Sequence, residues 1–123
     1  MKFVKILKSE KEIELNGNMW YISDIISSIK VDIENIIEEN DLDIEIEDIE
    51  LIGSYTRGEN VPSSDLDVLV QYSGDISDDS LFNIISEYNL ELDGIKVDVN
   101  PINSAKDSIQ DFKERNKGFT KRR

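Results

Sequence analysis

Two carboxylates, Asp65 and Asp67, begin one of the most apolar segments of the chain, which continues with branched aliphatic residues to Val70. In an extended strand the side chains at positions i and i+2 point to the same side, so both aspartates are predicted to project together while Leu66 faces the opposite layer. Two neighbouring carboxylates repel each other and are costly to bury unless a cation compensates them. Because hard divalent ions such as Mg²⁺ prefer oxygen ligands, the pair predicts a cation site.

A third aspartate, Asp98, lies within a second β-branched segment, KVDVNP. If this segment forms the strand beside residues 66–72, Asp98 joins Asp65 and Asp67 in one cluster. Three carboxylates can hold two Mg²⁺ ions roughly 3.5 to 4 Å apart, which stabilises both the attacking and the leaving oxygen in phosphoryl-type transfer. The three aspartates are therefore the candidate metal ligands and catalytic residues.

A Gly-Ser pair, Gly53-Ser54, ends an earlier strand pattern upstream of the aspartates. Glycine lets the backbone approach a phosphate closely, and the amides at the start of the short helix that follows can point toward an anion. The Ser54 hydroxyl adds a donor. Arg57, about one turn later, could supplement this charge stabilisation, although an exposed arginine on a short helix explains the residue equally well.

The composition excludes several other kinds of site. Cysteine and histidine are absent, which removes Ser-His and Cys-His catalysis and every metal site built from those ligands. With 14 bases and 27 acids the net charge is −13, which disfavours bulk nucleic-acid binding because that binding depends on cationic neutralisation of phosphates. The spacing of Gly53 and Gly58 matches the start of a P-loop, but Glu59-Asn60 replaces the Lys-Ser/Thr that would contact phosphate and metal. No apolar stretch approaches the roughly 20 residues that span a bilayer, so we expect a cytoplasmic protein without a membrane partner.

The pattern of apolar residues predicts the elements that position these groups in one α+β domain over residues 1–123. Residues 3–7 and 12–15 look extended, and Asn16-Gly17-Asn18 marks a turn, which predicts an N-terminal β-hairpin extension over residues 1–22. Isoleucines spaced by three and four residues predict an amphipathic helix from Ser23 to about Asn40, capped by Ser23 or Asp24. The other predicted elements are strands over residues 44–52, 66–72 and 95–99, the last stopped by Asn100-Pro101, and helices over residues 54–60, 80–87 (capped by Asp79) and about 106–117.

Charge is unevenly distributed along the chain. Residues 32–50 carry ten acids and no base, which fits a solvated helix face with its exit loop, or an anionic patch that recruits a cation or a basic partner. Asp41-Leu42-Asp43 repeats the Asp-x-Asp spacing within this run without an apolar strand after it, so it is not a candidate site. Residues 113–123 carry a net charge of +5, and this basic tail either frays into solvent or contacts an anionic patch on this chain or on a partner.

Taken in order, the candidate residues resemble the motifs of the minimal nucleotidyltransferases of the DNA polymerase beta-like superfamily. In that family a strand ends in Gly-Ser, a short helix follows, Asp-x-Asp opens the next strand, and a third Asp lies on a later strand. The matching block covers about residues 44–101, with Gly53-Ser54, Asp65-Leu66-Asp67 and Asp98 in these places. The string GSYTRGENVPSSDLDVLV looks especially like the G-S-x-x-R-G…S-D-x-D form of the small stand-alone members, which adds Arg57 and Ser64 to the nucleotide-binding candidates.

The resemblance implies a nucleotidyltransferase fold, a small mixed β-sheet with helices mainly on one face. It also implies transfer of a nucleoside monophosphate from an NTP, often ATP, to an acceptor hydroxyl with release of pyrophosphate. Carried over by position, Asp65 and Asp67 would ligate two Mg²⁺ ions, while Asp98 would ligate the catalytic ion and help to deprotonate the acceptor. Gly53 and Ser54 would hold the β- and γ-phosphates. Many small members resemble antitoxins of HEPN–nucleotidyltransferase toxin–antitoxin pairs, which modify a tyrosine of the toxin with AMP, so a HEPN-type toxin is the implied protein partner.

Three alternatives stay open from the sequence. A catalytically silent nucleotidyltransferase-like domain could bind or neutralise a toxin without chemistry, although intact acids argue against silence. A non-enzymatic acidic interaction protein, such as a nucleic-acid mimic, is supported by the charge alone. Transfer to a small molecule of the aminoglycoside type is less favoured, because such enzymes usually need a further domain to hold the substrate.

Overall fold

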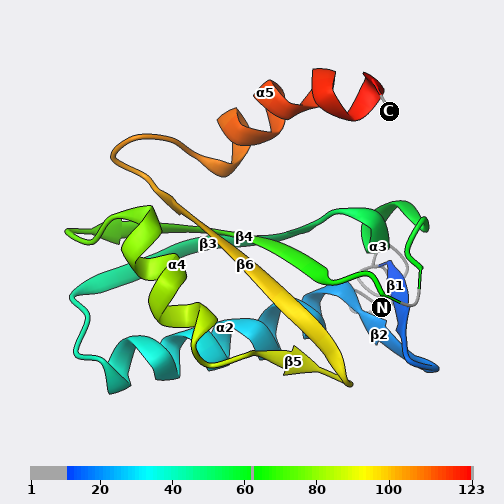
Figure 1. Cartoon of the computed structure of the whole chain (residues 1–123), viewed down its shortest axis with the longest axis horizontal. Helices are drawn as coiled ribbons and strands as arrows, with labels where there is room; N and C mark the ends of the chain where they lie inside the picture. Colours follow the sequence, from blue (N-terminus) through cyan, green and yellow to red (C-terminus); the bar gives the residue numbers. More distant parts are fainter. Residues whose placement is uncertain (1–10, 62, 123) are drawn as a thin grey trace, which may run out of the picture.

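The computed structural model describes residues 11–61 and 63–122, with side chains described as far as residue 115. A β-hairpin leads into a long helix, which is followed by a sheet interleaved with shorter helices (Figure 1). The fold is α+β, as predicted. The elements are β1 (Glu12–Leu15), β2 (Asn18–Tyr21), α2 (Ile22–Glu39), β3 (Ile44–Ile52), α3 (Ser54–Arg57), β4 (Leu66–Gly74), α4 (Asp78–Ser86), β5 (Glu91–Leu92), β6 (Ile95–Asn103) and α5 (Ile109–Arg122).

The main sheet is mixed, with the strand order β3-β4-β6-β5. β3 runs antiparallel to β4 and β5 runs antiparallel to β6, whereas the central strands β4 and β6 are parallel. A parallel pair requires a crossover connection, which α4 provides between β4 and β6. The parallel pairing brings the starts of β4 and β6 to the same end of the sheet, so residues at the two starts become neighbours.

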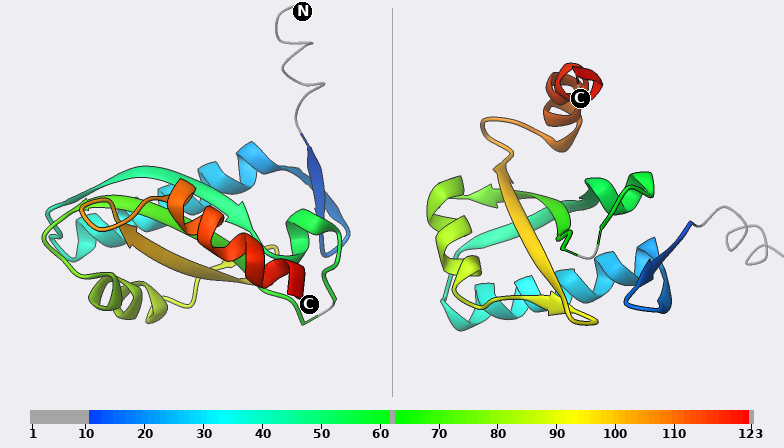
Figure 2. Two further views of the ribbon diagram at one scale, coloured as in Figure 1. Left: turned by 90° about the horizontal axis from the view of Figure 1, so that it is seen from above. Right: turned by 45° about the vertical axis from the view of Figure 1, so that its right-hand side comes forward.

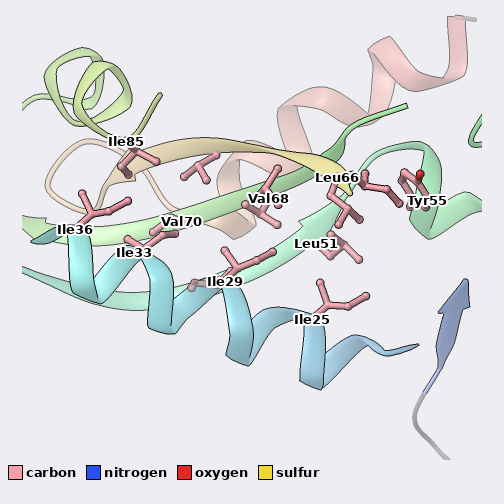
Figure 3. Close-up of a cluster of buried hydrophobic side chains, with 14 of the residues drawn as sticks. Ile25, Ile29, Ile33, Ile36, Leu51, Tyr55, Leu66, Val68, Val70 and Ile85 are labelled. Atoms are coloured by element: carbon pink, nitrogen blue, oxygen red, sulfur yellow. The ribbon is translucent and has the colours of Figure 1, made fainter. Parts of the chain in front are cut away.

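The two faces of the sheet carry different cores. On one face α2 and α4 pack against the sheet, and Figure 3 shows Ile25, Ile29 and Ile33 of α2 directed toward the sheet, where Leu51 of β3 and Val68 and Val70 of β4 lie. On the other face α5 packs through Ile109, Leu69 and Ile102, with Phe112 beside them. Figure 2 shows α5 and α2 on opposite sides of the sheet. Because side chains alternate along β4, Leu66, Val68 and Val70 enter the larger core while Asp67, Leu69 and Gln71 face the side of α5.

The hairpin is attached to the sheet at the β5–β6 turn, where three side chains converge on Asp93. Asn16 Nδ2 donates to the Asp93 carbonyl oxygen at 2.6 Å, and the Asp93 Oδ2 atom accepts from Asn18 Nδ2 at 3.1 Å and from Trp20 Nε1 at 2.7 Å. The apolar side chain of Leu15 is fully buried in the larger core. The hairpin is therefore part of the domain's packing.

The predicted hairpin is confirmed over residues 12–21, and its predicted segment 3–7 lies outside the described residues. The predicted strand over residues 44–52 is also confirmed. The predicted end of strand β6 at Asn100-Pro101 is wrong, since β6 continues to Asn103. The N–H groups of Val97 and Asn103 point away from β4 and donate to the Leu90 carbonyl oxygen and to Asp78 Oδ1. Pro101 lies an even number of positions from both residues, so the N–H that proline lacks would also point away from β4. The proline therefore costs the β4–β6 ladder no hydrogen bond.

The predicted caps are wrong at two helices, and the predicted bounds are wrong at a third. Helix α2 begins at Ile22 with Tyr21 as its N-cap and no side-chain cap, because β2 runs directly into it and leaves Ser23 and Asp24 inside the first turn. Helix α4 begins at Asp78 because the Ser77 hydroxyl accepts from Ser80 N, in place of the predicted Asp79. Helix α5 begins at Ile109, later than predicted, and ends at Arg122, beyond the predicted end at residue 117. The Ser108 hydroxyl caps its start by accepting a hydrogen bond from Asp111 N.

Helix α3 is shorter than predicted. It ends at Arg57 because Gly58 adopts the left-handed conformation, with φ 71° and ψ 22°, which stops the helix after one turn. Over the residues that the structure describes, no helix combines the length and the apolar character needed to cross a membrane.

Candidate active site

Asp67 and Asp98 are direct partners in the parallel pairing of β4 and β6. Adjacent strands lie roughly 4.8 Å apart, so two aspartates in register on the same face are side by side. Both side chains are half-buried. The strand pairing thus brings together two of the three predicted acids, which are 31 positions apart in the sequence.

The electrostatics of Asp67 reflect this crowding. The pKa of Asp67 is raised to about 6, mainly by burial and then by the Asp98 charge, a hydrogen bond with Asp98 and the Asp65 charge, while the Arg57 charge acts in the opposite direction. The negative charges of Asp98 and Asp65 therefore oppose a negative charge on Asp67. A cation placed against the pair would relieve the same repulsion.

Asp65 lies immediately before β4, half-buried, and its charge acts on Asp67. Within residues 11–61 and 63–115, no three or more His, Cys, Asp or Glu side chains converge as a ready-made metal site. Mg²⁺ is commonly held by one or two carboxylates together with substrate phosphates and water. The neighbouring carboxylates of Asp67 and Asp98 fit the protein's share of such a site, with the Asp65 charge beside them.

Gly53 lies against the Asp67 carboxylate. Ile52 pairs with Asp67 across β3 and β4, and the chain then turns at Gly53 with φ 89° and ψ −164°, a conformation essentially restricted to glycine. A Cβ atom at this position would lie 2.7 Å from Asp67 Oδ2, closer than any ordinary contact. Thr56 fixes the turn, because its Oγ1 donates to the Gly53 carbonyl oxygen at 2.6 Å. The Gly-Ser turn and the acidic pair thus form one continuous surface.

Helix α3 holds Ser54 next to this turn. Ser54 is its first residue and is half-buried, while Tyr55 is buried and anchors the helix in the larger core. From the hairpin, Lys11 Nζ donates to the Thr56 carbonyl oxygen at 2.7 Å. Sequence reasoning did not single out Lys11, and its place before the hairpin gives no signal of this contact.

Arg57 and Ser64, the other two nucleotide-binding candidates, lie on either side of the connection between α3 and β4. Arg57 is exposed and forms an ion pair with Glu59, with 2.8 Å between Nε and Oε1. Ser64 closes a local turn, in which its Oγ accepts from Val61 N at 2.9 Å and its N–H donates to the Val61 carbonyl oxygen at 2.8 Å. Arg57 acts on Asp67 through its charge, whereas the hydrogen bonds of Ser64 shape the loop that leads to Asp65.

Asn100 is a further polar residue of this face that the sequence analysis did not propose as a site residue. It lies two positions after Asp98, so it faces the same side, and its Nδ2 donates to the carbonyl oxygens of Val68 and Asp98 at 3.3 Å each. The i+2 spacing from Asp98 was the signal that could have found it. Asn100 links the two site strands next to the acidic pair.

The sequence has two further charged segments, Asp41-Leu42-Asp43 and the basic tail. Asp41 and Asp43 belong to the turn before β3, and Ile44 pairs with Gly74 at the end of the sheet opposite to Asp67. In the basic tail, Lys113 forms an ion pair with Glu50 of β3 and Arg115 forms one with Asp107, at 2.6 Å. The first bases of the tail therefore contact acids of this same chain.

A family model described as "Nucleotidyltransferase domain" matches residues 22–121. No curated protein and no solved structure matches the chain. Since the family model covers most of the sequence, the chain belongs to the nucleotidyltransferase domain family, whose members generally use a nucleoside triphosphate and Mg²⁺.

Proposed function

We propose that this member of the nucleotidyltransferase domain family transfers AMP from ATP to an acceptor hydroxyl and releases pyrophosphate. The observation that supports the proposal most directly is the pairing of Asp67 with Asp98, with Gly53 packed against the Asp67 carboxylate. Family membership supports nucleotidyl transfer in general. The choice of ATP as donor is part of the proposal.

In this proposal Asp65, Asp67 and Asp98 are the catalytic residues and hold Mg²⁺, with two ions when the nucleotide is bound. When bound, Mg²⁺ would neutralise the phosphate charge and stabilise the attacking and leaving oxygens. Asp98 accepts the proton of the acceptor hydroxyl as its oxygen bonds to the α-phosphorus. The bond from the α-phosphorus to the bridging oxygen breaks, and pyrophosphate leaves.

The same proposal assigns the phosphates to the turn at Gly53. The Gly53 and Ser54 amides and the Ser54 hydroxyl bind the β- and γ-phosphates, since glycine leaves the backbone accessible to an anion. Arg57 contributes positive charge, for which it would have to exchange Glu59 for phosphate, and Ser64 holds the loop before Asp65. An exposed arginine pair with glutamate contributes little to stability, so this exchange costs little.

For the acceptor we propose a tyrosine of a protein, with a HEPN-type toxin as the cognate partner and an antitoxin role in the cytoplasm. The support is the similarity of the motif string at residues 53–70 to small stand-alone nucleotidyltransferases. We further propose that residues 1–123 act as one nucleotidyltransferase domain, with the catalytic block at 44–101 and the basic tail at 113–123.

The test is Mg²⁺-dependent binding of ATP to the purified protein, followed by mass spectrometry of a co-purified or added acceptor. We expect binding in the wild type and its loss in the double variant Asp65→Asn/Asp67→Asn. The matched control is Asp41→Asn/Asp43→Asn, which removes the same two charges at the same spacing from the opposite end of the sheet and should bind ATP normally. Absence of ATP binding by the wild type, or equal loss in both variants, would contradict the proposal.

A catalytically silent binding module is the second candidate function. It is favoured by one observation, that the acids of the described residues form a pair and no set of three. Normal Mg²⁺-ATP binding with no pyrophosphate release in the presence of the cognate partner would support it over the enzyme. A non-enzymatic acidic interaction protein would neither bind Mg²⁺-ATP nor release pyrophosphate.

A further inference from the structure

A groove of about 570 Å³ lies between the hairpin and the connection that follows α3. Residues 11–14 and 16 line one wall, and Tyr55, Arg57 and residues 58, 60 and 61 line the other. Figure 1 shows β1 and α3 at the same end of the molecule, the end where β4 begins. The groove therefore borders the phosphate-binding turn proposed above.

The wall formed by β1 is the edge of a strand. Four consecutive residues, Lys11 to Glu14, line the groove, although successive side chains of a strand point to opposite faces. Only an edge presents both sets of residues at once. Within the described part of the chain β1 pairs with β2 alone, and no residue of β2 lines the groove, so the edge that faces the groove is the one without a strand partner.

The hydrogen bonds of the hairpin show which backbone groups this edge offers. Ile22 N donates to the Lys11 carbonyl oxygen, so Lys11 and Ile22 form a hydrogen-bonded pair. In an antiparallel ladder such pairs alternate with non-hydrogen-bonded ones. Glu12 and Glu14, opposite Tyr21 and Met19, therefore direct their N–H and C=O groups outward into the groove.

The side chains at this edge define what would fit. The exposed carboxylates of Glu12 and Glu14 lie on one face of β1, and the buried Ile13 lies on the other. Opposite charges on neighbouring strands stabilise a sheet pair, and so do neighbouring apolar side chains. A strand added here would place basic side chains beside the glutamates and apolar ones beside Ile13.

The groove is also connected to the site. Tyr55 and Arg57 of α3 line the groove, and α3 begins at Ser54, directly after Gly53, which lies against the Asp67 carboxylate. A segment lying in the groove thus contacts the helix whose first residue belongs to the proposed phosphate-binding turn.

We propose that this groove is the acceptor site, and that it binds an extended peptide segment with alternating basic and apolar residues as a third strand on β1. The inference rests on the proposed function and specifies how its acceptor docks. The docked segment presents a tyrosine whose oxygen forms a bond to the α-phosphorus of ATP. The bond to pyrophosphate breaks, and the phenolic proton passes to Asp98.

The test uses a nine-residue synthetic peptide with blocked ends, in which Lys and Val alternate around one central tyrosine. AMP transfer to the peptide is measured by mass spectrometry with the full-length protein, Mg²⁺ and ATP. In the variant Glu14→Pro the outward N–H is lost while the β1–β2 ladder keeps its hydrogen bonds, and a proline is tolerated at a strand edge. The matched control Glu14→Gln removes the charge and keeps the N–H.

We expect Glu14→Pro to reduce kcat/KM for the peptide at least tenfold, with Glu14→Gln changing it no more than about threefold and ATP affinity equal in all three proteins. We expect the peptide with N-methylated alternate residues to be a poor acceptor, since it cannot extend the ladder. A wild type that binds Mg²⁺-ATP but labels no peptide, or equal labelling by Glu14→Pro, would overturn the inference. Faster labelling by Glu14→Pro would also overturn it, by assigning the edge to residues 1–10 of the chain, whereas failure to bind ATP would contradict the proposed function instead.

Discussion

Replacing Gly53 with alanine tests whether the Gly-Ser turn and the acidic pair act as one unit. A Cβ at residue 53 would lie 2.7 Å from Asp67 Oδ2, and ordinary contacts begin at 3.4 Å, so the carboxylate or the turn must move by about 0.7 Å. The backbone conformation, φ 89° and ψ −164°, adds a cost of about 1 to 3 kcal/mol for any residue with a side chain.

The displacement is expected to affect activity as well as folding. A misplacement of about 1 Å in a catalytic group can cost roughly 100-fold in rate. We therefore expect Gly53→Ala to lower kcat/KM for nucleotidyl transfer by about 10- to 100-fold, which corresponds to about 1.4 to 2.7 kcal/mol of transition-state stabilisation. Pyrophosphate release measures the rate, and urea denaturation measures the free energy of unfolding.

Gly58→Ala is the matched control. Gly58 also has a positive φ, 71°, but a Cβ there meets nothing within 4 Å. This variant should lose about 1 kcal/mol of stability from the left-handed backbone and keep the wild-type kcat/KM for ATP at saturating acceptor. Wild-type activity in Gly53→Ala, or an equal loss of activity in the two variants, would refute the argument that the collision with Asp67 is what requires glycine.

Three further predictions concern pH, the hairpin and a buried hydroxyl. The pKa of Asp67 is raised from 3.8 to about 6 in the folded protein, so its contribution to stability is fully present below pH 3.8 and is lost as pH rises through 6. Without Mg²⁺, Asp67→Asn should therefore gain stability relative to the wild type across this pH window in urea titrations. A stability difference that does not depend on pH would contradict the raised pKa. Asp93→Gly keeps the positive φ of residue 93 but removes the carboxylate that accepts hydrogen bonds from Trp20 and Asn18. We expect the free energy of unfolding to fall by about 1 kcal/mol and the fluorescence of Trp20, the single tryptophan, to shift to the red. Unchanged emission would show that the hairpin does not depend on this contact. Tyr72 is fully buried, with its hydroxyl 2.7 Å from the Ile76 carbonyl oxygen and 2.9 Å from Asp78 Oδ1. Tyr72→Phe should lower the free energy of unfolding, measured by urea denaturation, by about 1 to 2 kcal/mol and leave kcat/KM unchanged, because these hydrogen bonds lie away from the ends of β4 and β6 that carry the aspartates. A loss of activity without a loss of stability would contradict this.

Local patterns predicted the elements better than their ends. The isoleucine spacing of α2 and the alternation in β3 reflect burial on one side, which each segment carries in its own residues. The caps at Ser77 and Ser108 were missed because several neighbouring Ser and Asp residues could serve, and only the path of the chain selects one. Pro101 was taken as the end of a strand because proline lacks the N–H that a strand partner would accept. It is tolerated here because that missing N–H is directed away from β4, and the sequence does not show on which side of β6 a partner strand lies.

The candidate site divides in a similar way. The sequence by itself determined the residue types, since an Asp-x-Asp pair and an Asp inside apolar strands have no packing explanation, and it determined that Gly53 precedes them at a strand end. Only the tertiary structure decided that Asp67 and Asp98 share a register and that Gly53 touches Asp67, because both depend on the pairing of strands far apart in the chain. It also decided that the hairpin reaches α3 through Lys11 and turns the edge of β1 toward a groove, which follows from contacts across more than 40 residues that no local pattern encodes.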